Sequence, residues 1–245
     1  MVYLTGFHAI KERIKVCATD CALFVAKPGP RAREIVSLAT KSGITVIRKG
    51  ISELDRVSPG HRGIALEISG ADQSAEVTLD SFLENLDGKE NVLAVVMDEI
   101  TDPHNFGAIL RSCDQFNADI VITRNRRTAR NADIVAKTSA GASAWVRSVC
   151  VANLPRAVER LKEEGFWIYG ADMKGTPVYK SELRGRVCII LGGEGAGLSR
   201  LLKERCDALV SVPSFGRVDS LNVSVAAGVI MYEVMRQRAD DAPAR

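Results

Sequence analysis

Apolar and polar residues follow two alternating periods along most of this chain. Short apolar runs of the kind that form buried strands stand between stretches whose apolar residues recur at helical spacing. In the first 70 residues this pattern predicts strands at 22–26, 44–47 and 63–68, and helices at 7–16, 31–42 and 51–57. We therefore predict a small unit of mixed helices and strands at the N-terminal end.

From residue 91 the same alternation resumes with more hydrophobic strands. The expected strands are 92–97, 120–123, 167–169, 187–191 and 208–212. The expected helices are 105–115, 132–139, 154–164, 198–204 and 222–237. Near-continuous apolar strands separated by helices indicate an α/β fold whose parallel sheet is covered on both faces. The last helix is apolar almost all round, so we expect it to be buried within its domain or against a second subunit.

The stretch between these two regions differs in composition. Residues 71–90 hold six acidic residues against one basic residue, and we interpret them as an acidic linker with room for one helical turn around 79–86. The predicted domains are therefore residues 1–70 and 91–245. Residues 1–70 and 101–160 carry net charges of +5 and +4, in a chain whose total is +3. Such a distribution is compatible with a polyanion that contacts both regions, and equally with two solvated surfaces.

Cysteine usage and hydropathy exclude several classes of protein. Of the six cysteines, only Cys17 and Cys21 are close in sequence, and no second Cys or His pair completes a zinc site, so we expect no metal. No apolar run approaches membrane-spanning length, and the N-terminus lacks the pattern of a secretion signal. We expect a cytoplasmic protein with unpaired thiols and no contact with a membrane.

Three loops rich in glycine, asparagine and serine follow predicted strands, at 102–112, 191–199 and 212–224. Ligands of parallel sheets bind at the carboxyl ends of strands, so these loops predict one shared pocket. The second loop contains Gly192-Gly-Glu-Gly-Ala-Gly197, whose spacing matches neither the dinucleotide-binding nor the phosphate-loop pattern. Its glycines indicate either close approach to a ligand or a tight turn without one, and Glu194 is either exposed or functional.

Polar side chains of the first and third loops are the other candidates for chemistry. Asn105 and Arg111 can both be reached from the N-terminal end of one predicted helix. Arg111 follows apolar residues, a placement suited to binding a phosphate or carboxylate, although a surface pair with Asp114 explains it as well. Ser220 or Asn222 suits the N-cap of the last helix.

The three loops together resemble a known family. Asn105-Phe-Gly-Ala-Ile-Leu-Arg111, Leu191-Gly-Gly-Glu-Gly-Ala-Gly-Leu198 and Ser220-Leu-Asn-Val-Ser-Val-Ala-Ala-Gly228 resemble motifs one, two and three of the SpoU (TrmH-type) RNA ribose 2'-O-methyltransferases, which belong to the SPOUT class. The N-terminal segments Gly6–Ile10 and His61–Ile64 resemble the substrate-binding domain of the bacterial 23S rRNA guanosine-2'-O-methyltransferase branch. The resemblance therefore covers nearly the whole chain.

This resemblance implies an α/β-knot fold, with a parallel sheet and a C-terminal trefoil knot, preceded by a small α/β domain that binds the substrate. It also implies S-adenosylmethionine as cofactor and a homodimer formed through the C-terminal knot helices. By motif position, main-chain groups of these residues would bind the cofactor: Leu191, Gly192, Gly193, Val212, Leu221 and Asn222. The catalytically important family positions fall on Arg111, Asn105, Glu194, Ser220 and Asn222.

The activity that the resemblance implies is methylation of a ribose 2'-hydroxyl in RNA, with a guanosine of 23S rRNA as the expected target. Arg111 would stabilise the developing alkoxide and dock the adjacent phosphate, because a guanidinium stays charged in proteins. Asn105 and Glu194 would orient Arg111 and the ribose, and Ser220 with Asn222 would shape the pocket. Alternatives are a tRNA 2'-O-methyltransferase or a resistance-type 23S rRNA methyltransferase of the same family, and a non-catalytic RNA-binding protein on the same fold.

Overall fold

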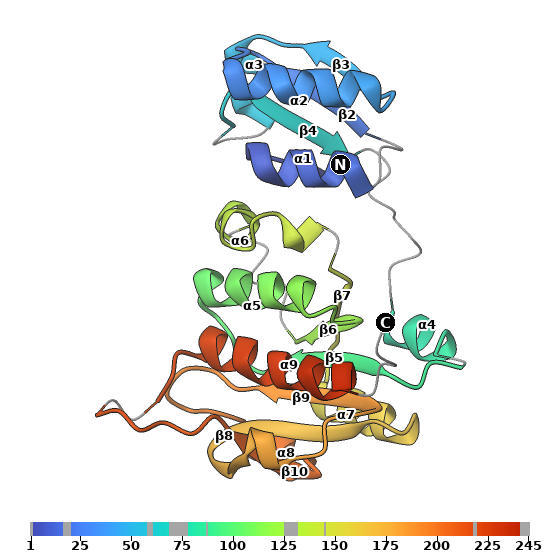
Figure 1. Ribbon diagram of the computed structural model, residues 1–245, viewed down its shortest axis with the longest axis vertical. Coiled ribbons are helices and arrows are strands. Elements are labelled where there is room, and N and C mark those ends of the chain that lie inside the picture. The colour runs from blue at the N-terminus through green and yellow to red at the C-terminus, as the bar shows by residue number, and fades with distance from the viewer. Residues whose placement is uncertain are drawn as a thin grey trace. The chain divides into compact units, whose positions relative to one another are not determined.

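The computed structural model of the protein describes residues 2–16, 21–57, 61–68, 78–86, 88–124, 132–144, 146–217 and 220–240. It divides into two compact units (Figure 1). The first consists of Met1–Glu76 and Ala132–Trp145, and the second of Val77–Asn131 and Val146–Arg245.

The first unit contains a four-stranded sheet in the order β1-β4-β2-β3. Strands β2 and β3 are parallel, and β4 is antiparallel to both β1 and β2. Its strands are β1 (Val2–Leu4), β2 (Cys21–Val25), β3 (Thr45–Arg48) and β4 (Ile64–Ile68). Its helical segments are α1 (Phe7–Val16), α2 (Pro30–Lys41), α3 (Ile51–Val57), α6 (Ala132–Thr138) and the 3-10 turn η2 (Ala142–Ala144). Every helix and strand predicted within the first 70 residues is present; the sequence does not predict β1, because a three-residue run carries no readable period.

The second unit contains a six-stranded, wholly parallel sheet in the order β10-β8-β9-β5-β6-β7. Its strands are β5 (Val92–Met97), β6 (Ile120–Thr123), β7 (Ser148–Cys150), β8 (Trp167–Pro177), β9 (Arg186–Leu191) and β10 (Ala208–Ser211). Its helical segments are α4 (Leu79–Glu84), α5 (Pro103–Gln115), α7 (Leu154–Glu163), η3 (Val178–Lys180), α8 (Arg200–Lys203) and α9 (Val223–Asp240). The α/β fold with a parallel sheet is thus confirmed, while the trefoil knot stays a prediction from the resemblance.

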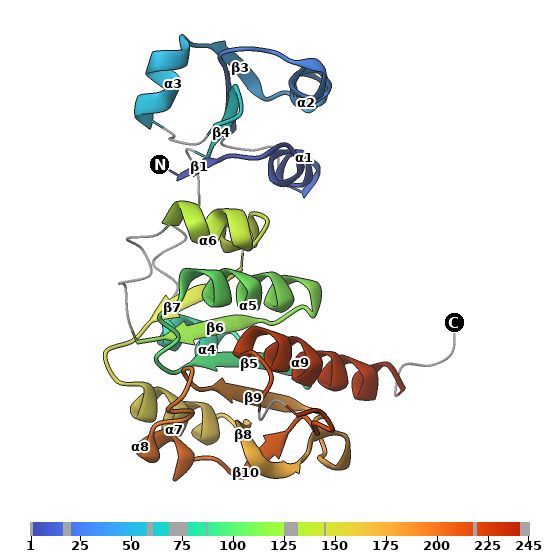
Figure 2. The ribbon, with the colours of Figure 1, turned by 90° about the vertical axis from the view of Figure 1, so that its left-hand side faces the viewer.

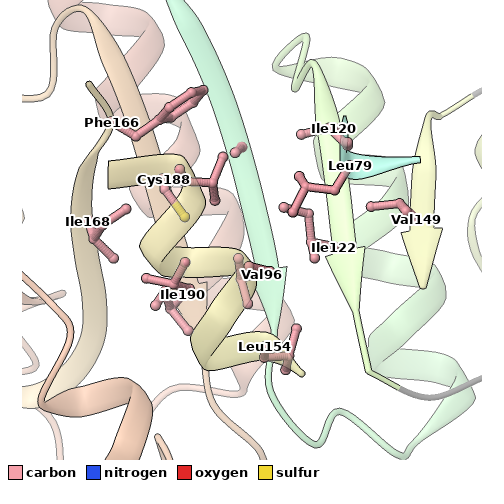
Figure 3. Packing of buried hydrophobic residues seen from close by; sticks show 14 of the residues in the cluster. Leu79, Val96, Ile120, Ile122, Val149, Leu154, Phe166, Ile168, Cys188 and Ile190 are labelled. Carbon is pink, nitrogen blue, oxygen red and sulfur yellow. The ribbon is translucent and has the colours of Figure 1, made fainter. Parts of the chain in front are cut away.

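Helices cover both faces of this sheet, as the continuous apolar strands predict. On one face Val92, Ala94 and Val96 pack with α4, α7 and α8 in a single buried cluster, and Figure 3 shows α7 lying over that face. The alternate residues Leu93 and Val95 are also fully buried and point to the opposite face. Helices α5 and α9 pack against each other (Figure 2), and each contributes buried apolar side chains to the unit.

Part of the acidic stretch 71–90 contributes to this core. The expected helical turn is α4, whose N-cap Thr78 exchanges hydrogen bonds with Ser81 in a capping box. Leu79, Phe82 and Leu83 of α4 lie in the same buried cluster as β5. The second unit therefore begins upstream of residue 91, with a helix whose apolar face the acidic composition conceals.

Two strands of the second unit differ from the prediction. Strand β8 runs to Pro177, well beyond the predicted 167–169, because its polar second half still pairs with β10. Strand β7 is not predicted, since its three residues alternate exposed, buried and exposed at the edge of the sheet. In each case backbone pairing determines a strand that carries no continuous apolar run.

Most of the described cysteines are free thiols, as expected. These are Cys113, Cys150, Cys188 and Cys206. Burial raises the pKa of the Cys113 thiol to about 12 and that of Cys206 to about 11. These side chains behave as small hydrophobic residues. Within the described residues no helix is long and apolar enough to cross a membrane.

Candidate functional site

The three loops meet because of how the parallel strands are ordered. Strands β5 and β9 are neighbours, with Met97 beside Leu191 at their carboxyl ends. From β5 the chain continues towards β6 and β7 at one edge of the sheet, whereas from β9 it continues towards β10 at the opposite edge. A boundary where successive connections leave in opposite directions is the usual ligand-binding place in such sheets. The first and second loops start there, next to each other.

The first loop turns directly into α5. Asp102 is the N-cap, and its carboxylate accepts hydrogen bonds from the backbone N–H groups of His104 and Asn105. Pro103 occupies the first helical position, where its missing N–H costs nothing. Asn105 is thereby held in the first turn of α5 and is buried. Sequence reasoning did not single out Asp102, although an Asp-Pro pair before a helical pattern is a readable start signal.

The second loop folds back on itself and against the first. A side chain at Gly192 would come within 2.2 Å of the backbone of Gly197, and one at Gly193 within 2.8 Å of the carbonyl oxygen of Glu99. Glu99 itself has a φ of 55°, a conformation rare for a residue with a side chain. The sequence predicted that these glycines allow either close approach to a ligand or a tight turn. At Gly192 and Gly193 the structure shows two segments of backbone that approach each other closely.

A buried carboxylate fixes the end of the second loop. Asp98 directly follows β5, and its N–H donates to the carbonyl of Leu191 at 2.8 Å. Its Oδ2 accepts the backbone N–H of Ser199 at 2.8 Å. Asp98 thus holds both ends of the loop, and sequence reasoning missed it. A carboxylate at the end of a continuous apolar strand was the available signal.

Three of the predicted site residues converge, one from each loop. Asn105 donates from Nδ2 to Oε1 of Glu194 at 2.7 Å. Asn222 donates from Nδ2 to Oδ1 of Asn105 at 2.9 Å and to the same Glu194 oxygen at 3.2 Å. Residues separated by up to 117 positions in the chain are joined in one polar network. The three loops that were predicted to share a pocket therefore meet at one polar network.

A backbone N–H at the start of α9 determines how the Asn222 amide is oriented, and Asn222 in turn determines the orientation of the Asn105 amide. Oδ1 of Asn222 accepts the backbone N–H of Ser224 at 2.9 Å and its hydroxyl at 2.6 Å. Because that N–H can only donate, Asn222 must turn its NH₂ group towards the network. Asn105 must then accept with its oxygen and donate with its nitrogen to Glu194. The result is a directed chain of hydrogen bonds from the start of α9 to the Glu194 carboxylate.

The other two predicted catalytic positions lie outside this network. Arg111 is exposed on α5, six residues beyond Asn105, which places it about 9 Å further along the axis and on a different side of the helix. Among the described residues its guanidinium has no ion pair, so the alternative of a surface pair with Asp114 is not what the structure shows. Ser220 is exposed, two residues before Asn222.

The predicted cofactor residues lie at the same edge of the sheet. Leu191 ends β9 and is followed by Gly192 and Gly193, and Val212 directly follows β10. Leu221 is 42% exposed just before α9. Further along the second loop, nothing lies within 4 Å of the position a side chain would take at Gly195 or Gly197. Gly195 is exposed, whereas the N–H of Gly197 already donates to the carbonyl of Gly193 at 3.0 Å. In the described residues no cluster of His, Cys, Asp and Glu is suited to a metal ion.

Comparison with known proteins defines the class. Residues 92–232 match the SpoU rRNA Methylase family. The chain is 38% identical over 242 residues to a protein of Photobacterium profundum named 23S rRNA (guanosine-2'-O-)-methyltransferase RlmB, covering 95% of this chain and 96% of that protein. An uncharacterized tRNA/rRNA methyltransferase of Borreliella burgdorferi is 40% identical over 218 residues, covering 86% of this chain and 96% of that protein.

Solved structures agree on the fold. The SpoU methyltransferase AviRb from Streptomyces viridochromogenes, in complex with AdoMet, matches with a TM-score of 0.72 at 23% identity, covering 98% of this chain and 91% of that one. An AdoMet-bound rRNA methyltransferase from Sinorhizobium meliloti matches with a TM-score of 0.71 at 18% identity, covering 96% and 87%. This chain belongs to the SpoU rRNA methylase family.

The double role of Asn222, as helix cap and as donor to the network, can be separated by mutation. Asn222→Ala should lower the free energy of unfolding by about 1 kcal/mol, because α9 loses its cap. Asn222→Ser should stay near the wild type in stability, since a serine hydroxyl can also cap, yet it too removes both donors to Asn105 and Glu194. Urea denaturation of the two variants checks this. Equal stability of both variants would contradict a capping role for Asn222.

Proposed function

We propose that this protein methylates a ribose 2'-hydroxyl of RNA with S-adenosylmethionine, and that its target is a guanosine of 23S rRNA. The observation that carries the proposal is the network of Asn105, Glu194 and Asn222, which unites the three family motifs at the carboxyl ends of β5 and β9. The named 23S rRNA relative aligns over 95% of this chain. Because the proposed substrate is ribosomal RNA, we also propose a cytoplasmic location for this protein.

The residues at the sheet edge fit the methyl donor. Exposed backbone at Gly195, together with the exposed apolar side chain of Leu221, offers main-chain hydrogen bonds beside an apolar surface. We propose that Leu191, Gly192, Gly193, Val212, Leu221 and Asn222 hold S-adenosylmethionine through main-chain groups. When bound, it supplies a methyl group already activated by the sulfonium, so the protein has mainly to align the acceptor and assist the loss of its proton.

Glu194 is the group best placed to meet the acceptor ribose. Both amides hold its Oε1, so the direction of the carboxylate is determined before any substrate arrives. Its side chain is exposed, and Oε2 has no hydrogen-bond partner among the described residues. We propose that Oε2 accepts a hydrogen bond from a ribose hydroxyl. Asn105 and Asn222 would then act by positioning Glu194, and exposed Ser220 would line the approach.

Arg111 would act on the substrate from a separate direction. Its place on another side of α5 favours docking of a backbone phosphate over direct contact with Glu194. A docked phosphate fixes the ribose that precedes or follows it, which lowers the entropic cost of alignment. The positive charge would also stabilise the alkoxide that develops as the hydroxyl reacts.

A homodimer is part of this proposal. On α9 the large apolar side chains of Val225, Val229 and Tyr232 are 52%, 39% and 57% exposed. Their spacing of four and three residues places them on one stripe of the helix. The opposite stripe, with Ala227, Ile230 and Val234, is buried in the unit. We propose that the exposed stripe packs against a second copy, as the family resemblance implies.

The first unit is proposed to bind the RNA substrate. Residues 1–70 carry eleven basic side chains, nine of which lie on α1, α2, β3 and their connections, consistent with a polyanionic partner. The division into residues 1–70, an acidic linker 71–90 and residues 91–245 stays a prediction, and the core position of α4 indicates that a catalytic fragment should start before Thr78.

Mapping of ribose methylation tests the function itself. In cells that lack this protein, one 2'-O-methylated guanosine of 23S rRNA should be lost, and it should return when the protein is expressed. Ribosomal and transfer RNA are sequenced for methylated riboses from both strains. Loss of a methyl group from tRNA with 23S rRNA unchanged would favour the transfer-RNA alternative, and no loss anywhere would favour a non-catalytic RNA-binding protein.

Substitution of Arg111 tests the catalytic assignment. Arg111→Ala should lower methyl transfer by about 100-fold or more, because a positioned charge is lost, while calorimetric binding of S-adenosylmethionine stays unchanged. Arg111→Lys keeps the positive charge but lacks the planar guanidinium with its paired N–H donors, and it should retain part of the activity. Near-wild-type transfer by Arg111→Ala with normal cofactor binding would remove Arg111 from the mechanism.

A charge on the α9 stripe tests the dimer. Val229→Glu should convert the protein to monomers in analytical ultracentrifugation, because a carboxylate in an apolar contact is not solvated. Leu201→Glu is the matched control: Leu201 is 48% exposed on α8, which packs on the other face of the sheet. The stripe is not the interface if both variants sediment like the wild type.

A further inference from the structure

The third loop presents an aromatic side chain that none of the roles above uses. Phe215 is 98% exposed, the highest value among the large hydrophobic residues that the structure describes as exposed. Its described neighbours Ser214, Gly216 and Arg217 are exposed as well. In Figure 1 the segment that directly follows β10 projects from the second unit. A phenylalanine fully in water contributes nothing to the core of this unit.

Both ends of this loop are held firmly. At its start, Ser211 is buried and donates from Oγ to the carbonyl of Gly175 at 2.8 Å. At its end, Asn222 belongs to the network with Asn105 and Glu194. Phe215 stands seven residues before Asn222, so the two are separated by no more than about 25 Å of extended chain. Whatever contacts Phe215 therefore lies within reach of an RNA strand that enters the proposed methylation site.

Arg217 adds a positive charge two residues from this ring. Among the described residues its guanidinium has no ion pair or hydrogen bond, and it is exposed. An exposed aromatic ring beside a free guanidinium is the combination that proteins use on single-stranded nucleic acid. The ring stacks on a base, and the cation neutralises a phosphate.

We propose that Phe215 and Arg217 form a platform for the RNA strand next to the methylated nucleotide, with a base stacked on Phe215 and a phosphate paired with Arg217. This inference rests on the proposed RNA substrate and deepens it. The adenine of the methyl donor is the less suitable occupant of Phe215, because a small-molecule site encloses most of its ligand, whereas this ring is open on all sides. Unstacked bases of loops and bulges suit such an exposed ring.

The platform predicts two separable effects on RNA binding. Phe215→Ala should weaken binding of unmodified 23S rRNA transcript by about 5- to 100-fold, the range for loss of one stacked base. Phe215→Trp should restore it, and Phe215→Leu, which is apolar but not aromatic, should not. Arg217→Ala should reduce the dependence of log K on log salt by about one phosphate contact, a slope change of about 0.7. Phe215→Ala should leave that slope unchanged.

The experiment measures affinity for the transcript at several salt concentrations with the full-length protein, alongside calorimetric binding of S-adenosylmethionine and sedimentation. Trp167→Ala is the matched control, because Trp167 is 59% exposed at the amino end of β8, the opposite edge of the sheet from the loops. It should bind RNA like the wild type.

Other outcomes overturn the inference in recognisable ways. Normal RNA binding by Phe215→Ala excludes the platform. Weakened binding of S-adenosylmethionine by Phe215→Ala assigns the ring to the methyl donor, and dissociation into monomers assigns it to the dimer interface. If wild-type protein methylates no RNA, the proposed function fails first; if it methylates the transcript and Phe215→Ala does so equally well, only the platform fails.

Discussion

The parallel pairing of β5 with β9 is the constraint on which the site depends. Their register places Met97 beside Leu191, so the two strands end together and their loops leave the sheet next to each other. A shift of the pairing by one residue would turn every side chain of one strand to the other face, and both faces are filled. The burial of Val92–Met97 on both faces is therefore what brings Asn105 within hydrogen-bond reach of Glu194.

Close backbone packing between the loops follows from this register. Gly192 and Gly193 lie where the second loop touches its own end and Glu99, and no side chain fits at either position. The glycines at the two places thus have a structural reason that is independent of any ligand. Gly195 and Gly197 differ, since both have positive φ and open space around them. One glycine-rich loop therefore combines positions that shape the protein with a position, Gly195, that remains open to a ligand.

The sequence predicted most of the fold and the convergence of Asn105, Glu194 and Asn222, for identifiable reasons. Continuous apolar strands and helical spacing are visible in one dimension, and the loops that follow them must lie at one edge of a parallel sheet. The geometry inside the site was not predictable in this way. In the structure Asn105, Glu194 and Asn222 form a network, while Arg111 lies outside it. This difference depends on which side of α5 faces β9, and residue spacing alone does not determine that side. Asp98 and the burial of α4 were missed because an acidic residue or an acidic stretch conceals burial that only tertiary contacts reveal.

The packing of α5 against α9 connects the site to the rest of the second unit. Asn105 lies in the first turn of α5 and Asn222 caps α9, so the N-terminal ends of two packed helices converge on one carboxylate. Positive helix ends favour negative charge nearby, and both amides donate to it. Further along, Cys113 Sγ lies 4.0 Å from Met231 Sδ, so the two helices are in direct contact there as well. Any contact that moves α9 relative to α5, including a partner on the stripe of Val225, Val229 and Tyr232, must therefore act on the distance between Asn105 and Asn222. The proposed dimer and the alignment of Glu194 therefore involve the same pair of helices.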